Sequence, residues 1–185
     1  MMRYLVIVSL VMLLSIVSVV VPFTFPIRST PAVQDNRHEQ LILARAAAAI
    51  QNAEPEWRYI TGICNCVSAF TREQVGVATG TWYRSLNGSS DHINVTLYGI
   101  ATAGAAARLI YGETHGHHGK GWSVTSYKLG DGANMATYLD TYRGVTQYSI
   151  TVRKERFLAS ISGQSRDAVE RFAQFLVREM SVGTP

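Results

Sequence analysis

The spacing of hydrophobic and polar positions changes along the chain, and each change predicts a different element. A continuous apolar run comes first, from Tyr4 to Val21, interrupted only by serines. Between residues 38 and 53, apolar positions recur at helical spacing within an alanine-rich stretch of high helix propensity. Pro55 follows soon after. This pattern predicts a helix over 38–53 that ends before the proline.

Beyond that helix, apolar and polar positions alternate, which is the period of a β-strand. Ile93, Val95 and Leu97, for example, fall on one face of a predicted strand, and polar residues fall on the other. Short segments that mostly contain glycine separate the alternating stretches. The predicted strands are 57–63, 74–85, 92–99, 122–130, 135–144, 146–154 and 156–163.

Two more helices complete the predicted fold. Helical spacing returns over 102–112 and over 165–180, where Ser165 occupies the N-cap position. Each helix follows a strand that ends in glycine, "INVTLYG" in the first case and "FLASISG" in the second, which suggests two β-strand/helix half-repeats. The sequence therefore predicts an α+β fold: a mostly antiparallel β-sheet with helices packed on one face, preceded by one N-terminal hydrophobic helix.

The N-terminal apolar run predicts export. Arg3 precedes it, and a basic start followed by an apolar core is typical of a signal peptide. The run is also about 18 residues long, the lower limit for a helix that crosses a bilayer. Residues 1–21 are thus predicted to be a signal peptide or a single transmembrane anchor, and the proline-rich residues 22–37 a linker. Residues 38–182 would form a single extracytoplasmic domain, either anchored to the membrane of the cell envelope or, if the signal is cleaved, periplasmic or secreted.

The charge pattern limits the partners. The net charge is +4, and the one basic cluster, "RKER" at 153–156, contains Glu155. A nucleic-acid interface needs a larger concentration of cations, so nucleic acid is not expected as a partner. The expected partners are the membrane, through the N-terminal hydrophobic segment, and an envelope protein or a small-molecule ligand.

Two short motifs supply the candidate metal ligands. Cys64 and Cys66 lie in "CNC", and His115, His117 and His118 lie in "HGHH". Thiolates and neutral imidazoles bind zinc and copper, so these five residues would form a site if the fold brings them together. Two alternatives stay open. The histidines can belong to an exposed glycine-rich loop, and the cysteines can form a disulfide, which needs a turn because strand geometry places their Cα atoms about 6.6 Å apart.

No motif of a known enzyme class is present in the sequence. It contains no GxSxG nucleophile elbow, no phosphate-binding P-loop and no GxGxxG dinucleotide fingerprint. A serine hydrolase built on Ser160, Ser162 or Ser165 is a third alternative, which only geometry can test.

Aromatic residues recur along the predicted strands. A sheet face of this kind can bind apolar or sugar-like ligands through ring faces and hydroxyls, although strand propensity alone also favours aromatics. The residues are Trp82, Tyr83, Tyr98, Trp122, Tyr127, Tyr138, Tyr142 and Tyr148. The leading hypothesis is therefore a non-enzymatic, ligand- or protein-binding module of the cell envelope. The alternative is extracytoplasmic handling of zinc or copper through the CxC and HGHH motifs.

Overall fold

The structure is a computed structural model that describes residues 36–62, 73–86, 89–115 and 121–182. All of them belong to one compact unit, Gln34–Pro185, and the predicted N-terminal hydrophobic helix lies outside the described residues. Among the helices that are described, none is both long and apolar enough to cross a bilayer.

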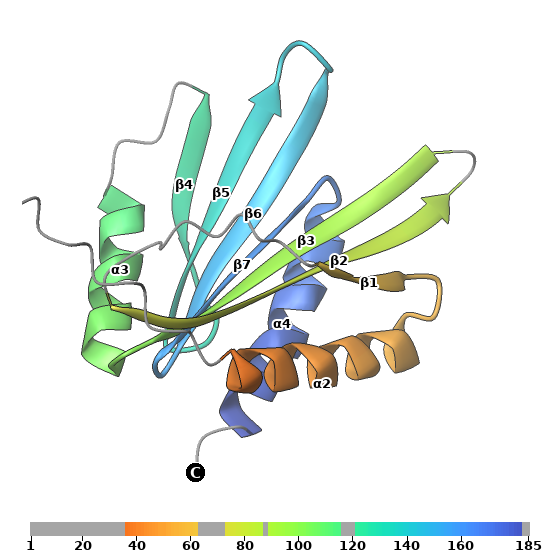
Figure 1. Cartoon of the computed structure of the whole chain (residues 1–185). Helices are drawn as coiled ribbons and strands as arrows, with labels where there is room; N and C mark the ends of the chain where they lie inside the picture. Colours follow the sequence, from red (N-terminus) through yellow and green to blue (C-terminus); the bar gives the residue numbers. More distant parts are fainter. Residues whose placement is uncertain (1–35, 63–72, 87–88, 116–120, 183–185) are drawn as a thin grey trace, which may run out of the picture. The chain divides into compact units, whose positions relative to one another are not determined.

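The fold is α+β, and its centre is a seven-stranded sheet in which every neighbouring pair is antiparallel (Figure 1). The strand order is β1-β2-β3-β7-β6-β5-β4, so the first and second halves of the sheet join where β3 pairs with β7. All seven predicted strands are confirmed. Their bounds are Arg58–Gly62 (β1), Gln74–Leu86 (β2), Ser89–Ile100 (β3), Trp122–Tyr127 (β4), Gly132–Asp140 (β5), Val145–Lys154 (β6) and Phe157–Gly163 (β7).

The described residues also form three helices at the predicted positions: α2 (Arg37–Ala53), α3 (Ala103–His115) and α4 (Arg166–Val182). The backbone N–H of Ala168 donates to Ser165 Oγ at 3.4 Å, which confirms Ser165 as the N-cap of α4.

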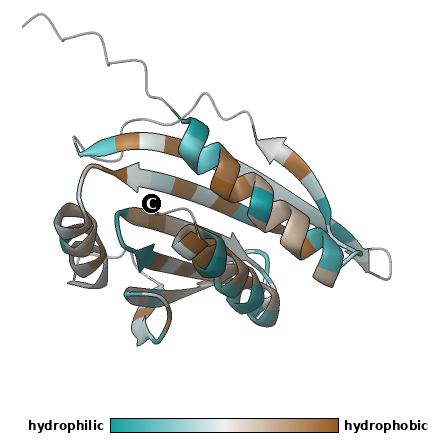
Figure 2. Cartoon of the chain, turned by 90° about the horizontal axis from the view of Figure 1, so that it is seen from below, coloured by the Kyte–Doolittle hydropathy of each residue, from teal (hydrophilic) through white to brown (hydrophobic). Residues whose placement is uncertain are grey.

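One face of the sheet packs against α2 and α4 and forms the main core. Hydropathy alternates along the strands, as Figure 2 shows, and the apolar positions point toward these two helices. Ile93, Val95 and Leu97 of β3 are buried there, as the alternation predicts. Trp82 and Phe172, both fully buried, meet edge to face with ring centroids 5.3 Å apart. This contact ties α4 to β2 through a large apolar area.

The third helix corrects the prediction that all helices pack on one face. Ala105 and Ala106 of α3 cluster with Leu158, whose side chain points away from the main core because its neighbours Phe157 and Ala159 point into it. A three-layer arrangement results, with α3 opposite α2 and α4. The half-repeat prediction is wrong for the same reason, since equivalent helices of two related halves would lie on the same face of the sheet.

The strand predicted over 135–144 ends earlier, at Asp140. One carboxylate oxygen of Asp140 accepts the backbone N–H groups of Tyr142 and Arg143, each at 3.1 Å, which folds the chain into a turn. Gly144 completes that turn at φ 66°, a conformation that side chains disfavour. Tyr142 is therefore a turn residue, 96% exposed, rather than part of a strand face.

Candidate functional site

The predicted metal ligands fall outside the part of the chain that the structure can test. Cys64, Cys66, His117 and His118 lie outside the described residues, and His115 ends α3 with its side chain undescribed. Within the described ranges, no group of three or more His, Cys, Asp or Glu side chains is placed to hold a metal ion. The zinc or copper site stays a prediction.

Of the groups that a serine hydrolase would use, Ser165 and three aspartates make structural contacts, whereas Ser160 and Ser162 lie on the sheet face described below. Ser165 caps α4, as shown above. Asp91 pairs with Arg84 at 3.0 Å, and Asp140 shapes the turn that follows β5. Asp131 accepts the backbone N–H of Glu155 at 2.7 Å and the Lys154 ammonium at 2.9 Å. These bonds hold the pKa of Asp131 below its ordinary value, the backbone bond contributing most and the bond to Lys154 next.

The distinctive surface lies on the α3 side of the sheet. The two middle rows of side chains that point away from the main core on the four central strands are polar, and we call these two rows the polar face. On the same side of the sheet, Val77, Tyr98, Leu158 and Arg153 form the next row toward α3, and Tyr83 and His92 lie beyond the other row. The members of the polar face are hydroxyl or amide residues: Thr79 and Thr81 of β2, Asn94 and Thr96 of β3, Ser160 and Ser162 of β7, and Ser149 and Thr151 of β6.

The strand register arranges these eight side chains in two straight rows. The first row runs Thr81, Asn94, Ser162 and Ser149 across β2, β3, β7 and β6. Directly paired side chains on one face of an antiparallel sheet lie about 5 Å apart, so each row forms a continuous line of polar groups. The Thr81 hydroxyl donates to Asn94 Oδ1 at 3.0 Å, which sets the orientation of the exposed Asn94 amide.

The second row repeats this composition one step along the strands. It runs Thr79, Thr96, Ser160 and Thr151 across the same four strands. Both rows continue without charge onto β5 and β4, as Ala136 and Val124 in the first and Asn134 and Ser126 in the second. Neither row contains Lys, Arg, Asp or Glu, although these types make up 16% of the chain. Polar residues ordinarily line the solvated face of an antiparallel sheet, and here the middle of that face carries no charged residue.

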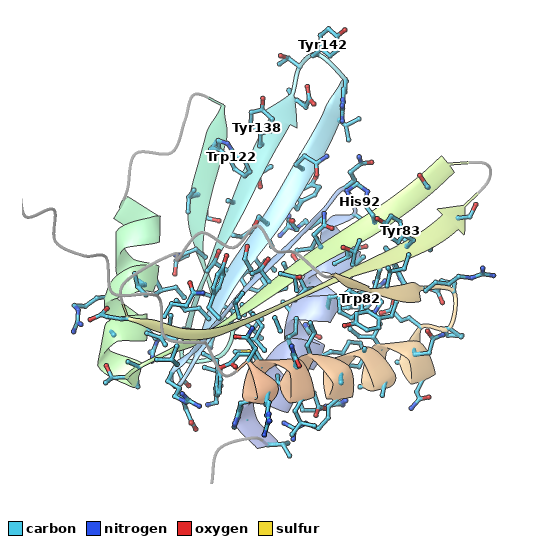
Figure 3. The ribbon with its side chains drawn as sticks, viewed as in Figure 1. Trp82, Tyr83, His92, Trp122, Tyr138 and Tyr142 are labelled. Carbon is cyan, nitrogen blue, oxygen red and sulfur yellow. The ribbon has the colours of Figure 1, made fainter. Side chains whose placement is uncertain are left out.

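Aromatic side chains flank the polar face at one end, on both halves of the sheet (Figure 3). Trp122 of β4 stacks on Tyr138 of β5 with ring centroids 5.0 Å apart and planes inclined by 23°, and Trp122 stays 41% exposed. On the other half, Tyr83 of β2 lies 6.3 Å from the ring of His92 on β3 and is 43% exposed. Exposed rings beside neutral hydroxyls give this end both apolar planes and hydrogen-bonding groups.

Tyr138 is fixed from its other side by the chain that leads into β4. Gly121 adopts φ 95°, and a Cβ atom there would lie 3.1 Å from Tyr138 Cε2. Only glycine meets both demands, because it tolerates this φ and lets the backbone approach the ring. The stacked pair is therefore held by the backbone as well as by its own contact.

At the opposite end of the polar face, α3 covers the sheet and leaves a small cavity of about 110 Å³. Leu109 and Ile110 of α3 and Leu158 of β7 supply its apolar wall, while Thr151 and Ser160 of the second row supply hydroxyls. Asn134 holds the helix in place by donating its amide to the Ile110 carbonyl at 3.1 Å. The cavity is thus continuous with the polar face and has a mixed lining.

The predicted aromatic residues lie on both sides of the sheet, and ligand binding by them stays a prediction. Tyr83, Tyr98, Trp122 and Tyr138 lie on the α3 side, whereas Trp82, Tyr127 and Tyr148 pack against or within the main core. Sequence alternation alone assigns these faces correctly within each strand. Alternation does not show which strands are neighbours, and the polar face forms only because β2, β3, β7 and β6 lie side by side.

A second polar group lies on the helix side and links α2, β1 and α4. Glu54, 9% exposed, accepts the Trp57 indole N–H at 3.1 Å and two bonds from Arg171, at 2.6 and 3.1 Å. These bonds to Glu54 raise the pKa of the Arg171 guanidinium. Arg84 stacks over Trp57 at 4.4 Å, so this cluster is closed by contacts within the protein and serves the fold.

No protein-family model matches this chain, and comparison with curated proteins also gives no match.

Proposed function

We propose that the protein is an exported or membrane-anchored domain of the cell envelope, which binds a ligand or a partner through the polar face and does not catalyse a reaction. The apolar run Tyr4–Val21 supports the proposed location, and the polar face supports the proposed binding role. The observation that carries the proposal is the composition of the two rows, which present eight hydroxyl or amide side chains and no charge across four strands.

A binding role explains that composition physically. Hydroxyl and amide groups both donate and accept hydrogen bonds, so a dense array of them can match a polar ligand from several directions. Surfaces that combine Tyr or Trp with Ser and Asn are typical of recognition sites, because rigid rings supply contact area and short polar side chains adapt. Among the described elements, α3 is the one that packs on this side of the sheet.

Site-specific photo-crosslinking in the cells that make the protein tests this proposal. A photoreactive residue replaces Ser162 at the centre of the polar face in the full chain, and a matched variant carries it at the exposed Gln174 of α4. The expected result is a discrete adduct from position 162, lost when Thr96→Lys places a charge on the paired strand, and no such adduct from position 174. Equal labelling from both positions, or no adduct from position 162, would overturn the proposed binding role.

A further inference from the structure

The polar face has a chemistry that selects among ligand classes. The two rows and their extensions carry no charge, and the nearest cation beyond the second row, Arg153, donates to the backbone carbonyl of Asp131 at 2.7 Å. Lys154 is held by the same residue at 2.9 Å. Polyanions such as nucleic acids need an array of cations with room to contact phosphates. The polar face therefore suits a neutral ligand.

Lipids and protein partners fit this face less well. A lipid or a stable protein interface needs a contiguous apolar patch, whereas the apolar side chains here are separated by hydroxyl rows. The remaining class is a neutral, hydroxyl-rich molecule.

We infer that the ligand of the polar face is a neutral saccharide chain, an inference that rests on the binding role proposed above. A sugar ring has one C–H-rich face, which stacks on an aromatic plane, and a rim of hydroxyls, each of which donates and accepts. The exposed Trp122–Tyr138 stack provides the plane, and the rows provide the hydrogen-bonding partners. A chain rather than a single sugar fits, because the rows span four strands and neighbouring strands lie about 4.8 Å apart.

The cavity beneath α3 is expected to favour saccharides that carry one particular substituent, an acetamido group. Its apolar wall, Leu109, Ile110 and Leu158, faces the hydroxyls of Thr151 and Ser160, and its volume of about 110 Å³ exceeds what a single water needs. An acetamido group has the same two-sided character, with a methyl group beside an amide. Saccharides that carry this group are therefore expected to bind more tightly than those that carry a hydroxyl at the same carbon.

Titration calorimetry of the full chain in mild detergent tests the inference with three neutral probes: the β-1,4-linked hexamer of N-acetylglucosamine, cellohexaose and maltohexaose. The first two share one backbone and differ at a single substituent on each ring. The expected result is binding of at least one hexamer, with the N-acetylglucosamine hexamer bound more tightly than cellohexaose. Equal affinities for these two would remove the cavity from the binding site.

Two substitutions locate the binding. Trp122→Ala removes the exposed half of the stack and is expected to weaken binding about tenfold or more. Tyr142→Ala is the matched control, because Tyr142 is an aromatic residue on the adjacent hairpin that is 96% exposed in the turn after β5; it should leave affinity unchanged. Thr96→Lys blocks the centre of the face without touching the stack, and unchanged far-ultraviolet circular dichroism would show that each variant is folded.

Binding that Trp122→Ala and Thr96→Lys both leave intact would overturn the inference, as would the absence of binding to all three hexamers. If no hexamer binds but position 162 gives a discrete photo-adduct, the ligand is not a saccharide, and the proposed binding role is still supported. Failure of the photo-adduct would instead remove the binding role itself.

Discussion

The carboxylate of Glu54 offers the sharpest test of how the helices are held to the sheet. Glu54→Ala removes the acceptor of the Trp57 indole N–H, and Trp57 is fully buried. An unsatisfied donor at such a site costs about 1–3 kcal/mol. The loss of the ion pair adds less, about 0–1 kcal/mol, because the Arg171 side chain is 45% exposed and can return to water. We expect a total loss of about 1–4 kcal/mol in the free energy of unfolding.

Urea unfolding followed by tryptophan fluorescence measures this loss. Asn52→Ala, at an exposed position of the same helix, is the control and should change the free energy by less than about 0.5 kcal/mol. In a Trp57→Phe background, Glu54→Ala should cost only the ion-pair share, about 1 kcal/mol or less, because the indole donor is already gone. A Glu54→Ala variant within about 0.5 kcal/mol of the wild type would refute the reasoning.

Two further predictions concern packing and charge. A Cβ atom at Gly99 would overlap the buried carboxylate of Glu39, so Gly99→Ala should destabilise by about 1–3 kcal/mol, whereas Gly104→Ala, on the exposed side of α3, should stabilise by about 0.5–1 kcal/mol in the same urea assay. Like effects of these two substitutions would contradict the close approach at Gly99. The lowered pKa of Asp131 means that its contribution to stability is present above its unfolded pKa of about 3.9 and is lost as the pH falls through its folded pKa. Asp131→Asn should therefore be less stable than the wild type at pH 7, with the difference closing below about pH 3; a difference that is independent of pH would argue against the bond to the Glu155 backbone.

The elements of the fold could be predicted because local periodicity determines them. Ile93, Val95 and Leu97 alternate with polar residues, and the strand that they form has the expected face toward the core. Strand order could not be predicted, because β3 pairs with β7 through contacts between Val95 and Ile161 that lie far apart in the sequence. Two half-sequences with similar strand-to-helix junctions gave no information about which face each helix would cover.

A short apolar stripe on α3 determines which face of the sheet this helix covers. Ala105 and Ala106 allow close approach, and the larger Leu109 and Ile110 pack against Tyr98 and Leu158. The sequence pattern of such a stripe is the same whichever face of the sheet the helix covers. Only the tertiary positions of its contacts distinguish the two sides.

The candidate site was hidden from sequence reasoning for a related reason. Each strand contributes two small polar residues, such as Ser160 and Ser162, that look like ordinary solvent-facing positions when taken strand by strand. They form continuous polar rows because the register aligns them with Asn94 and Thr96 on one side and Ser149 on the other. Cys64, Cys66, His117 and His118 lie outside the described residues, and the side chain of His115 is not described, so the metal site stays a prediction.

A nuclear magnetic resonance titration of the full chain with the N-acetylglucosamine hexamer tests the central claim most directly, because it reports the location of a contact and its strength together. We expect shifts in the backbone amides of Thr96, Ser160 and Ser162 and in the indole N–H of Trp122, with the amides on the exposed side of α4 unchanged. Shifts confined to α2 and α4, or a spectrum that does not change at saturating hexamer, would contradict it.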